Sequence, residues 1–222
     1  MKNKSVLIVG ASGAIGSACK KKFNEMQYDV YTLTSIKEKA DNIHCFWLDF
    51  NNPKSIDGLN LTKPIDCVII SAGKEPQHNL ESTNFEHLNE MMNIHLLGPI
   101  LLLKKLKPML NEDSAIVFLS SPAALKGSYD PIYAAAKGAV NSLIKTLAKD
   151  FAPKTRVNAV SPSLIEDSPV FKRMTADFRE KHLNNTLTNK HTTADQCADA
   201  IYFMSTQAQI TGQVLQVNGG MV

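Results

Sequence analysis

The sequence has few of the features that mark disulfide-rich or metal-binding proteins. Its four cysteines lie far apart, and no two of them form a C-x-x-C pair, which argues against a disulfide framework and against a cysteine-ligated metal site. Each lies in an apolar-looking segment, so we expect buried free thiols, no metal and a reducing, cytoplasmic environment. The four are Cys19, Cys45, Cys67 and Cys197.

Charge and hydropathy exclude two further classes of protein. The 24 basic and 21 acidic residues are interleaved, so no basic stripe suits a nucleic-acid backbone. No apolar run reaches the roughly 20 residues that cross a bilayer, and the run at 5–9 is too short for a signal peptide. We therefore expect no nucleic-acid partner and no membrane association.

What is present is a regular alternation of short β-rich runs with stretches of helical spacing. Several runs are apolar at nearly every position, which is typical of parallel strands covered on both faces. A chain of 222 residues favours one domain. The pattern predicts an α/β fold, a single doubly wound parallel sheet over 1–222, with strands at SVLIVG, YDVYTLT, IHCFWL, DCVIISAG, SAIVFLS, TRVNAVS and GQVLQVNGG.

The segment 163–191 interrupts this alternation because it is polar, charged and too long for a plain loop. We interpret it as a partly helical substrate lid. In doubly wound sheets, ligands bind beyond the carboxyl ends of the strands, where such a lid would lie.

A glycine-rich turn, GASGAIG, follows the first run at 10–16. Glycines let backbone approach a phosphate closely, and a helix N-terminus adds free N–H groups and a positive dipole end. The place of this turn after the first strand favours a dinucleotide, although a tight strand-to-helix turn would look the same.

The end of the second strand indicates which dinucleotide is bound. An acidic residue there would hold an unphosphorylated ribose, whereas this chain has Thr34 and Ser35, followed by Lys37 and Lys39. NADP(H) is therefore favoured over NAD(H). Each lysine is equally consistent with a solvated surface charge.

The stretch YAAAK places Tyr133 and Lys137 four residues apart, on one face if the segment is helical. Together with GASGAIG, SAG (71–73), SS (120–121), RVNAVSP (156–162) and ITGQVLQVNGG (210–220), it occurs in the order typical of the short-chain dehydrogenase/reductase family. The chain resembles the classical branch of that family, which includes 3-oxoacyl-[acyl-carrier-protein] reductases and other carbonyl reductases. The resemblance implies a Rossmann fold that binds a nicotinamide dinucleotide.

The resemblance also implies catalytic roles. Tyr133 would be the acid or base at the carbonyl oxygen, and Lys137 with the oxidised nicotinamide would lower the tyrosine pKa. Ser121 would hold the carbonyl oxygen, although Ser120 would restore the common spacing to the tyrosine.

Cofactor contacts are implied at the same matched positions. The phosphate turn comprises Gly10, Ser12, Gly13, Ala14, Ile15 and Gly16, and Asp49 with Phe50 would lie near adenine. Ala72, Gly73 and Lys74 would line the ribose, and Pro162, Ser163 and Ile165 would lie near nicotinamide.

The chain departs from the family pattern in three places. Ala14 replaces the middle glycine of the phosphate turn, and Ser163 replaces the glycine after Pro162. His95 stands where the family has a catalytic asparagine, and Asn93 lies two residues away on the other face of a helix. His95 could replace the asparagine in a proton relay, line the substrate pocket, or fill core.

The resemblance predicts an oxidoreductase that acts on a ketone, aldehyde, thioester-linked carbonyl or alcohol, and that forms a homodimer or homotetramer. A catalytically silent NADP(H)-binding regulator is the alternative. Charged residues in the lid could contact an acidic carrier or simply be solvated: Lys172, Arg173, Arg179 and Lys181.

Overall fold

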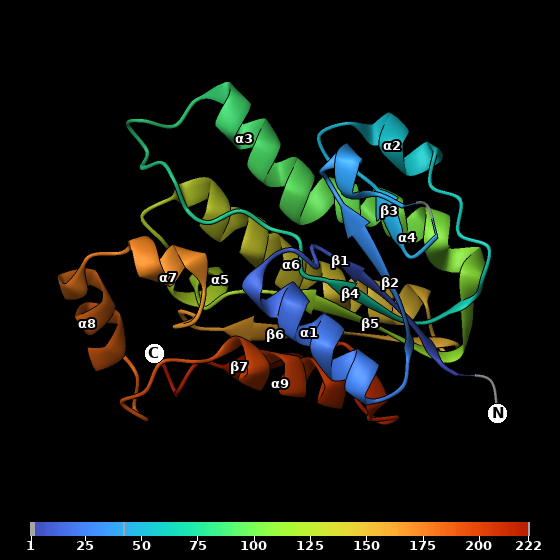
Figure 1. Cartoon of the computed structure of the whole chain (residues 1–222). Coiled ribbons are helices and arrows are strands. Elements are labelled where there is room, and N and C mark those ends of the chain that lie inside the picture. The colour runs from blue at the N-terminus through green and yellow to red at the C-terminus, as the bar shows by residue number, and fades with distance from the viewer. Residues whose placement is uncertain (1–2, 42, 222) are drawn as a thin grey trace.

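The computed structural model describes residues 3–41 and 43–221, which form a layer of strands between two layers of helices (Figure 1). The strands are β1 (Ser5–Val9), β2 (Asp29–Thr34), β3 (Cys45–Trp47), β4 (Ile65–Ile70), β5 (Leu110–Leu119), β6 (Thr155–Pro162) and β7 (Val214–Val217). They form one sheet in the order β3-β2-β1-β4-β5-β6-β7, and every neighbouring pair is parallel. The predicted doubly wound sheet is confirmed.

The helices connect the strands and cover both faces of the sheet. They are α1 (Ala14–Glu25), α2 (Pro53–Asp57), α3 (Phe85–Met92), α4 (Gly98–Leu106), α5 (Ala123–Lys126), α6 (Pro131–Asp150), α7 (Pro169–Arg173), α8 (Ala176–Asn184) and α9 (Ala194–Thr206). Two short 3-10 turns, η1 (Lys37–Lys39) and η3 (Lys107–Met109), and a π-helical turn, η2 (Asn93–Leu97), complete the connections. Within the ranges described, no helix has the length and apolar character that a membrane crossing needs.

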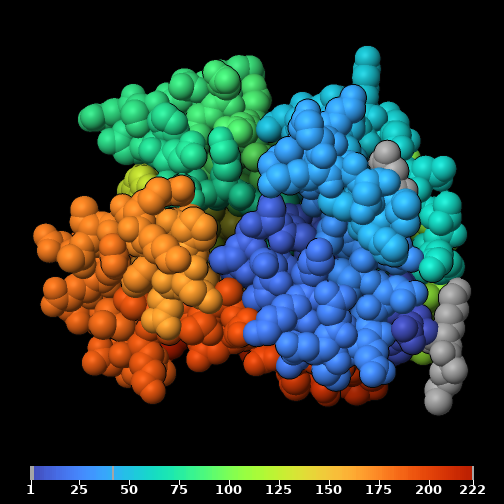
Figure 2. All heavy atoms as spheres, in the orientation of Figure 1, coloured from blue at the N-terminus to red at the C-terminus, as the bar shows by residue number. Residues whose placement is uncertain are grey.

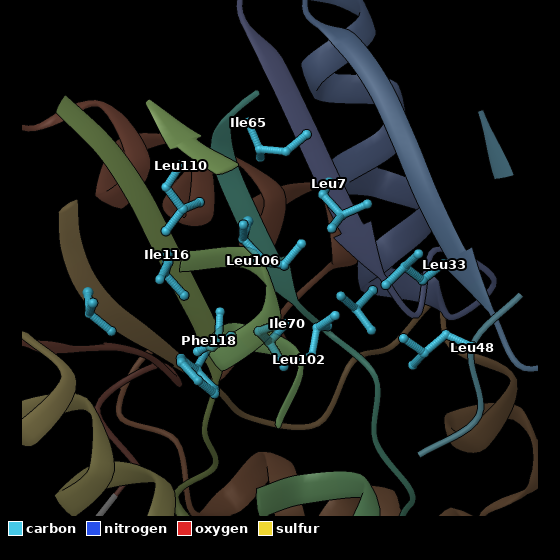
Figure 3. Close-up of a cluster of buried hydrophobic side chains, with 14 of the residues drawn as sticks. Leu7, Leu33, Leu48, Ile65, Ile70, Leu102, Leu106, Leu110, Ile116 and Phe118 are labelled. Carbon is cyan, nitrogen blue, oxygen red and sulfur yellow. The ribbon is translucent and has the colours of Figure 1, made fainter. Parts of the chain in front are cut away.

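One face of the sheet packs against α4 and α6. Leu102 and Leu106 of α4 meet side chains from β1, β4 and β5, as Figure 3 shows for Leu7, Ile70 and Ile116. Further along the same face, Val140 and Ile144 of α6 are buried. Burial of this apolar face fixes α6 against the sheet, and α6 carries Tyr133 and Lys137.

The other face packs against α1 and α9, which lie side by side (Figure 1). Phe23 of α1 and Ile201 of α9 are fully buried there. Cys19, Cys67 and Cys197 belong to the same cluster, so these three thiols are buried and free as expected. Cys45, in β3, is also free but only half-buried.

Two strands differ from the sequence-based expectation. β5 begins at Leu110 rather than Ser114, because Leu110 pairs with Ile65 before the register shifts and Ala115 pairs with Cys67. Asp113, with φ of 60°, lies inside this irregularity. β3 is shorter than expected and pairs only with β2, at the edge of the sheet.

The segment 163–191 contains α7 and α8 and lies beyond the end of β6, at the left in Figure 1. Its partly helical character was expected from its composition. Neither α7 nor α8 contains a buried residue. The segment therefore has little apolar packing to hold it down, as in many elements that move during ligand binding.

Gly98 allows the first turn of α4 to lie against Phe50. A Cβ atom added at Gly98 would overlap the Phe50 ring and lie 2.7 Å from the carbonyl oxygen of Asn93. Phe50 is only 6% exposed and belongs to the core, so the ring has little room to move away.

We predict that Gly98→Ala lowers the free energy of unfolding by about 1 to 3 kcal/mol, the usual cost of overpacking a core. Gly138→Ala is the matched control, because a Cβ atom at Gly138, also helical, meets no neighbour closer than 3.8 Å. It should be neutral or stabilising by about 0.5 to 1 kcal/mol. Urea unfolding of both variants measures the difference, and equal stabilities would contradict this packing account.

Candidate active site

The carboxyl end of β1 approaches the chain that follows β4 very closely. Gly10 has φ of +85°, and a Cβ atom there would lie 2.5 Å from the backbone nitrogen of Ala72. A Cβ atom at Gly16 would overlap the carbonyl oxygen of Gly10. Only glycine fits either position. Because the order of the sheet reverses between β1 and β4, this contact lies at the switch point where such sheets bind ligands.

The N-terminus of α1 is open at the same place. Gly13 is the N-cap residue and makes no side-chain cap, and the first turn contains no acidic residue. Ser12 and Gly13 are exposed, Ala14 and Ile15 are half-buried, and Gly16 is buried. The first backbone N–H groups of α1 are therefore available to an anion such as a pyrophosphate.

The end of β2 carries no carboxylate at the two positions expected to meet the ribose. The hydroxyl oxygen of Thr34 accepts a hydrogen bond from the backbone nitrogen of Ile36, at 3.2 Å. The carbonyl oxygen of Ser35 accepts one from the indole of Trp47, at 3.3 Å. The ammonium of Lys37 lies 5.5 Å from the centre of the Trp47 ring, which places a positive charge beside this edge.

Asp49 and Phe50 follow β3. Asp49 accepts a hydrogen bond from the backbone nitrogen of Asn51 at 2.9 Å, and its backbone is held by the Ser55 hydroxyl. The Phe50 ring packs against Gly98 in the core. Because the Phe50 ring is packed in the core, its side chain has little surface left to contact a nucleotide.

The chain after β4 is tied to His95. The Nε2 atom of His95 lies 3.1 Å from the carbonyl oxygen and 3.2 Å from the backbone nitrogen of Lys74. The Lys74 ammonium forms an ion pair with Glu90 of α3, at 2.6 Å. Gly73 lets the imidazole come close, because a Cβ atom there would lie 2.9 Å from His95 Cε1. The predicted residues Ala72, Gly73 and Lys74 therefore lie together beside His95.

Tyr133 and Lys137 lie on one face of α6, as their spacing predicts. The Lys137 ammonium lies 5.7 Å from the centre of the Tyr133 ring and donates a hydrogen bond to the carbonyl oxygen of Leu119, at 2.9 Å. Burial lowers the pKa of Lys137 to about 8. A lysine with this pKa can carry or release a proton near neutral pH.

The protein groups around Tyr133 raise the pKa of its phenol. Burial raises it, the Ser121 side chain partly offsets that rise, and the charge of Asp130 adds to it. These groups therefore keep the phenol protonated, and its lowering by Lys137 together with the oxidised nicotinamide stays a prediction. A further positive charge would be needed to favour the phenolate.

The two candidate serines have different surroundings. Ser120 is buried, and its hydroxyl donates a hydrogen bond to Asn141 of α6, at 2.6 Å. Ser121 is half-buried, lies beside Tyr133, and accepts a hydrogen bond from the backbone nitrogen of Ala123. Ser121 therefore presents its hydroxyl to Tyr133, whereas Ser120 uses its own hydroxyl proton to hold α6.

His95 is buried inside the π-helical turn η2, and only 3% of it is exposed. Its ring meets the Tyr133 ring edge-to-face, with centroids 5.5 Å apart. Burial and the nearby Lys137 lower the pKa of His95 to about 2, so the imidazole is neutral. In the part of the chain that the structure describes, its Nδ1 atom is buried without a partner. Such an atom marks a place for a water or ligand.

Asn93 lies away from this group, as expected from its offset. Its amide donates to Asn51, at 3.4 Å, on the side of the sheet where β3 lies. Asn93 and His95 both belong to the π-helical turn η2, and such turns are frequent at functional sites.

The residues after β6 are held to β7 and to the end of segment 163–191. The backbone nitrogen of Ser163 donates to Val217, and the Ser163 hydroxyl lies 2.7 Å from the Thr192 hydroxyl. Ile165 forms a bridge with Thr192 and is 8% exposed. The predicted nicotinamide contacts Pro162, Ser163 and Ile165 thus form the fixed start of the segment.

Segment 163–191 reaches across to the chain after β4. Arg173 forms an ion pair with Glu75, at 2.8 Å. Figure 2 shows the surface hollowed between this orange segment, the blue start of α1 and the green region around α3. The side chains of Ser121, Tyr133 and His95 come from elements that end at this side of the sheet.

Sequence reasoning missed Asp130 and His87, which form a buried pair at the N-terminus of α6, with Nε2 and Oδ2 3.0 Å apart. A signal for Asp130 was present. Aspartate followed by proline is a common start of a helix, and Pro131 is the first residue of α6. Nothing local marks His87, whose position follows only from the packing of α3 against α6.

Comparison with known proteins agrees with this geometry. Residues 57–222 match the family model described as enoyl-(acyl carrier protein) reductase. The chain is 29% identical to an uncharacterised oxidoreductase of Bacillus subtilis, YmfI, over 98% of both chains. It is 32% identical to the 3-phenylpropionate-dihydrodiol/cinnamic acid-dihydrodiol dehydrogenase of Escherichia coli, over 72% of this chain and 67% of that protein.

A solved structure extends the likeness to the fold. The short-chain dehydrogenase/reductase of Brucella melitensis, described as a glucose/ribitol dehydrogenase, superposes with a TM-score of 0.89. It shares 27% identity, and the match covers 100% of this chain and 98% of that one.

The neutral His95 predicts how stability depends on pH. Its pKa is about 2 in the folded protein and near 6.5 in the unfolded chain, so below pH 6.5 the unfolded state binds a proton that the folded state does not. Relative to His95→Asn, the protein should lose about 1.4 kcal/mol of unfolding free energy per pH unit below 6.5. Urea unfolding of both proteins from pH 7 to pH 5 measures this, and parallel curves would contradict it.

Proposed function

Because this chain belongs to the short-chain dehydrogenase/reductase family, whose members are nicotinamide-dependent oxidoreductases, we propose that it is an NADP(H)-dependent enzyme. In this proposal it transfers a hydride between nicotinamide and a ketone, aldehyde or alcohol, with Tyr133 as acid or base. The observation that carries the proposal is the group of Tyr133, Ser121 and buried Lys137 on the same side of the sheet as the open N-terminus of α1.

Six parts of the chain would hold the dinucleotide. The glycine turn and the uncapped α1 fit a pyrophosphate, since two positions of the turn exclude any Cβ atom and no carboxylate lies in the first turn. Lys137 and the chain after β4 would meet the nicotinamide ribose and adenosine sides. The proposed contacts are Gly10, Ser12, Gly13, Ala14, Ile15, Gly16, Thr34, Ser35, Asp49, Phe50, Ala72, Gly73, Lys74, Tyr133, Lys137, Pro162, Ser163 and Ile165.

When bound, the dinucleotide supplies or accepts the hydride. Ser121 would donate its hydroxyl proton to the carbonyl oxygen and hold that oxygen beside Tyr133. Tyr133, kept protonated by its surroundings, would give its proton to that oxygen as negative charge develops. Lys137 is largely protonated below pH 8, and its charge would stabilise the phenolate left behind.

His95 would complete the path by which Tyr133 regains its proton. Its buried Nδ1 atom has no hydrogen-bond partner among the described residues, and its ring contacts the Tyr133 ring. A water held at Nδ1 would link this neutral imidazole to the Lys137 side of the site. This gives His95 the relay role that asparagine has in the family.

Other features support narrower proposals. The exposed Leu97 of η2 and Leu101 of α4 suit the homodimer or homotetramer interface implied by the family resemblance. Free thiols in the core suit a reducing cytoplasm. Segment 163–191 would act as a substrate lid over a small-molecule or thioester carbonyl, because it borders the hollow and its helices α7 and α8 contain no buried residue.

Turnover tests the function directly. We expect the purified protein to oxidise NADPH faster than NADH with β-keto thioesters, diketones or aldehydes, followed at 340 nm. Tyr133→Phe should lower kcat by at least about 100-fold while keeping NADPH affinity, because it removes only the proton. Ser121→Ala should also lower kcat, whereas Ser120→Ala should act mainly on stability.

Tight NADPH binding without turnover on any of these compounds would contradict the enzyme and favour an NADP(H)-binding regulator. Retention of full turnover by Tyr133→Phe would contradict the role of Tyr133.

The preference for NADPH has its own test. Lys37→Gln removes the positive charge beside Trp47 and should raise KM for NADPH about tenfold, with little change for NADH. Lys149→Gln, at an exposed position in the last turn of α6, is a control of equal charge change that should leave the ratio unchanged. An equal rise for both cofactors in Lys37→Gln would contradict recognition of the 2′-phosphate by this lysine.

A further inference from the structure

Asp130 is a charged residue that the reaction described above does not use. None of its side chain is exposed, and it is the N-cap residue of α6, three residues before Tyr133. A fully buried carboxylate is costly unless its oxygens are hydrogen-bonded. Its surroundings therefore show what the fold gains from keeping it there.

The two carboxylate oxygens hold two different parts of the protein. Oδ1 accepts hydrogen bonds from the backbone nitrogens of Ile132 and Tyr133, at 3.1 and 3.0 Å. Oδ2 accepts from the backbone nitrogens of Gln77 and His78, at 2.9 and 3.3 Å, and lies 3.0 Å from His87 Nε2. One side of Asp130 thus holds α6, and the other side holds α3 and the chain between β4 and α3.

The carboxylate is ionised at neutral pH. Burial alone would raise its pKa, but the hydrogen bonds from Gln77, Tyr133, His78 and His87 together lower it. An ionised carboxylate only accepts hydrogen bonds, so Nε2 of His87 carries the proton. The His78 ring packs on the His87 ring, with centroids 4.3 Å apart.

The chain between β4 and α3, residues 71–84, forms one wall of the candidate active site. Lys74 contacts His95, Glu75 is paired with Arg173 of the lid segment, and Pro76 accepts a hydrogen bond from the Tyr129 hydroxyl, at 2.6 Å. This wall has no regular secondary structure of its own. Its position relative to Tyr133 therefore depends on such side-chain contacts.

We propose that Asp130 is a positioning residue, which fixes the Tyr133 end of α6 to the 71–84 wall through its two carboxylate oxygens and keeps a negative charge near the phenol. This inference rests on the proposed function, because it assigns Asp130 a role relative to the reacting tyrosine. His87, which belongs to α3, supports this position of Asp130 through its contact with Oδ2.

The negative charge affects the proton on Tyr133. After burial, the charge of Asp130 is the further contribution that raises the pKa of Tyr133. It therefore helps to keep the phenol protonated until a substrate oxygen takes the proton. A side chain that served only as a helix cap would not need to be charged.

Two substitutions distinguish the capping of α6 by Asp130 from its hydrogen bonds to the 71–84 wall. Ser at 130 can still cap α6, but it is too short to reach the 71–84 wall. Asn at 130 has nearly the shape of Asp, but one carboxylate oxygen is replaced by an NH₂ group. That group would face the backbone N–H donors of α6 or those of the 71–84 wall, and it cannot accept their hydrogen bonds. Asp130→Ser and Asp130→Asn should therefore each lower kcat/KM about tenfold through kcat, with little change in KM for NADPH.

His87 provides a conservative rescue. His87→Gln keeps an N–H donor that can reach Oδ2, whereas His87→Leu leaves that oxygen short of a partner. We expect His87→Gln to keep most of the activity that His87→Leu loses. Equal losses in the two variants would contradict the hydrogen bond to Asp130.

The stability control is Thr193→Ala, which removes the capping box of α9 away from Tyr133. It should lower Tm by an amount comparable to the Asp130 variants and leave kcat/KM unchanged. If Asp130→Ser and Asp130→Asn stay within twofold of wild-type kcat/KM, the positioning role is wrong. If Thr193→Ala loses as much activity as they do, the loss reflects stability and the role is also wrong.

A measurement without turnover separates this inference from the proposed function. In protein labelled with ¹³Cζ-tyrosine, the resonance missing from Tyr133→Phe identifies Tyr133, and its titration by NMR gives the pKa. Asp130→Asn should lower that pKa, whereas Asp113→Asn, an exposed carboxylate in β5, should not. An unchanged Tyr133 titration in Asp130→Asn overturns the inference even if turnover is found, and a lowered one supports it even if no substrate is turned over.

Discussion

The hydrogen bond from the buried Lys137 ammonium to the carbonyl oxygen of Leu119 joins α6 to the end of β5. A charge with only 5% of its residue exposed is costly, so this contact is kept only where the surrounding packing supports it. The apolar face of α6 provides that support through Val140 and Ile144. The position of Tyr133, one turn before Lys137, follows from the same contact.

Around this contact the fold brings together pieces that are far apart in the sequence. Ser121 arrives from the end of β5, His95 from the π-helical turn before α4, and the glycine turn from the end of β1. Parallel strands place all these carboxyl ends on one side of the sheet. The proposed reaction uses that side because the topology concentrates polar groups there while the two faces of the sheet are buried.

Much of the fold was predictable because its signals are local. Apolar runs such as SVLIVG and DCVIISAG are typical of strands covered on both faces, and each of the seven strands overlaps the run that predicted it, although the bounds of β3 and β5 differ. The i, i+4 spacing of Tyr133 and Lys137 likewise required only a helix. The sequence favoured Ser121 and left Ser120 as the alternative, and the hydrogen bond from Ser120 to Asn141 is a contact that the spacing did not predict.

The rest depends on contacts between distant segments. The direction of the Tyr133 pKa shift comes from burial, which no local pattern reports. The same holds for the neutral His95 and for the partners of Asp130, which belong to residues 77, 78 and 87. Phe50 was expected near adenine, and no local pattern showed that its ring also packs against Gly98.

The central claim is that a hydride crosses to a carbonyl carbon at Tyr133. The most direct measurement is mass spectrometry of the product formed from NADPH deuterated at the transferring C4 position, using the carbonyl compound with the highest turnover. The account predicts one deuterium on the new carbinol carbon with the wild-type protein, and none above background with Tyr133→Phe. Product that carries no deuterium from either C4 position, or equal labelling by Tyr133→Phe, would contradict it.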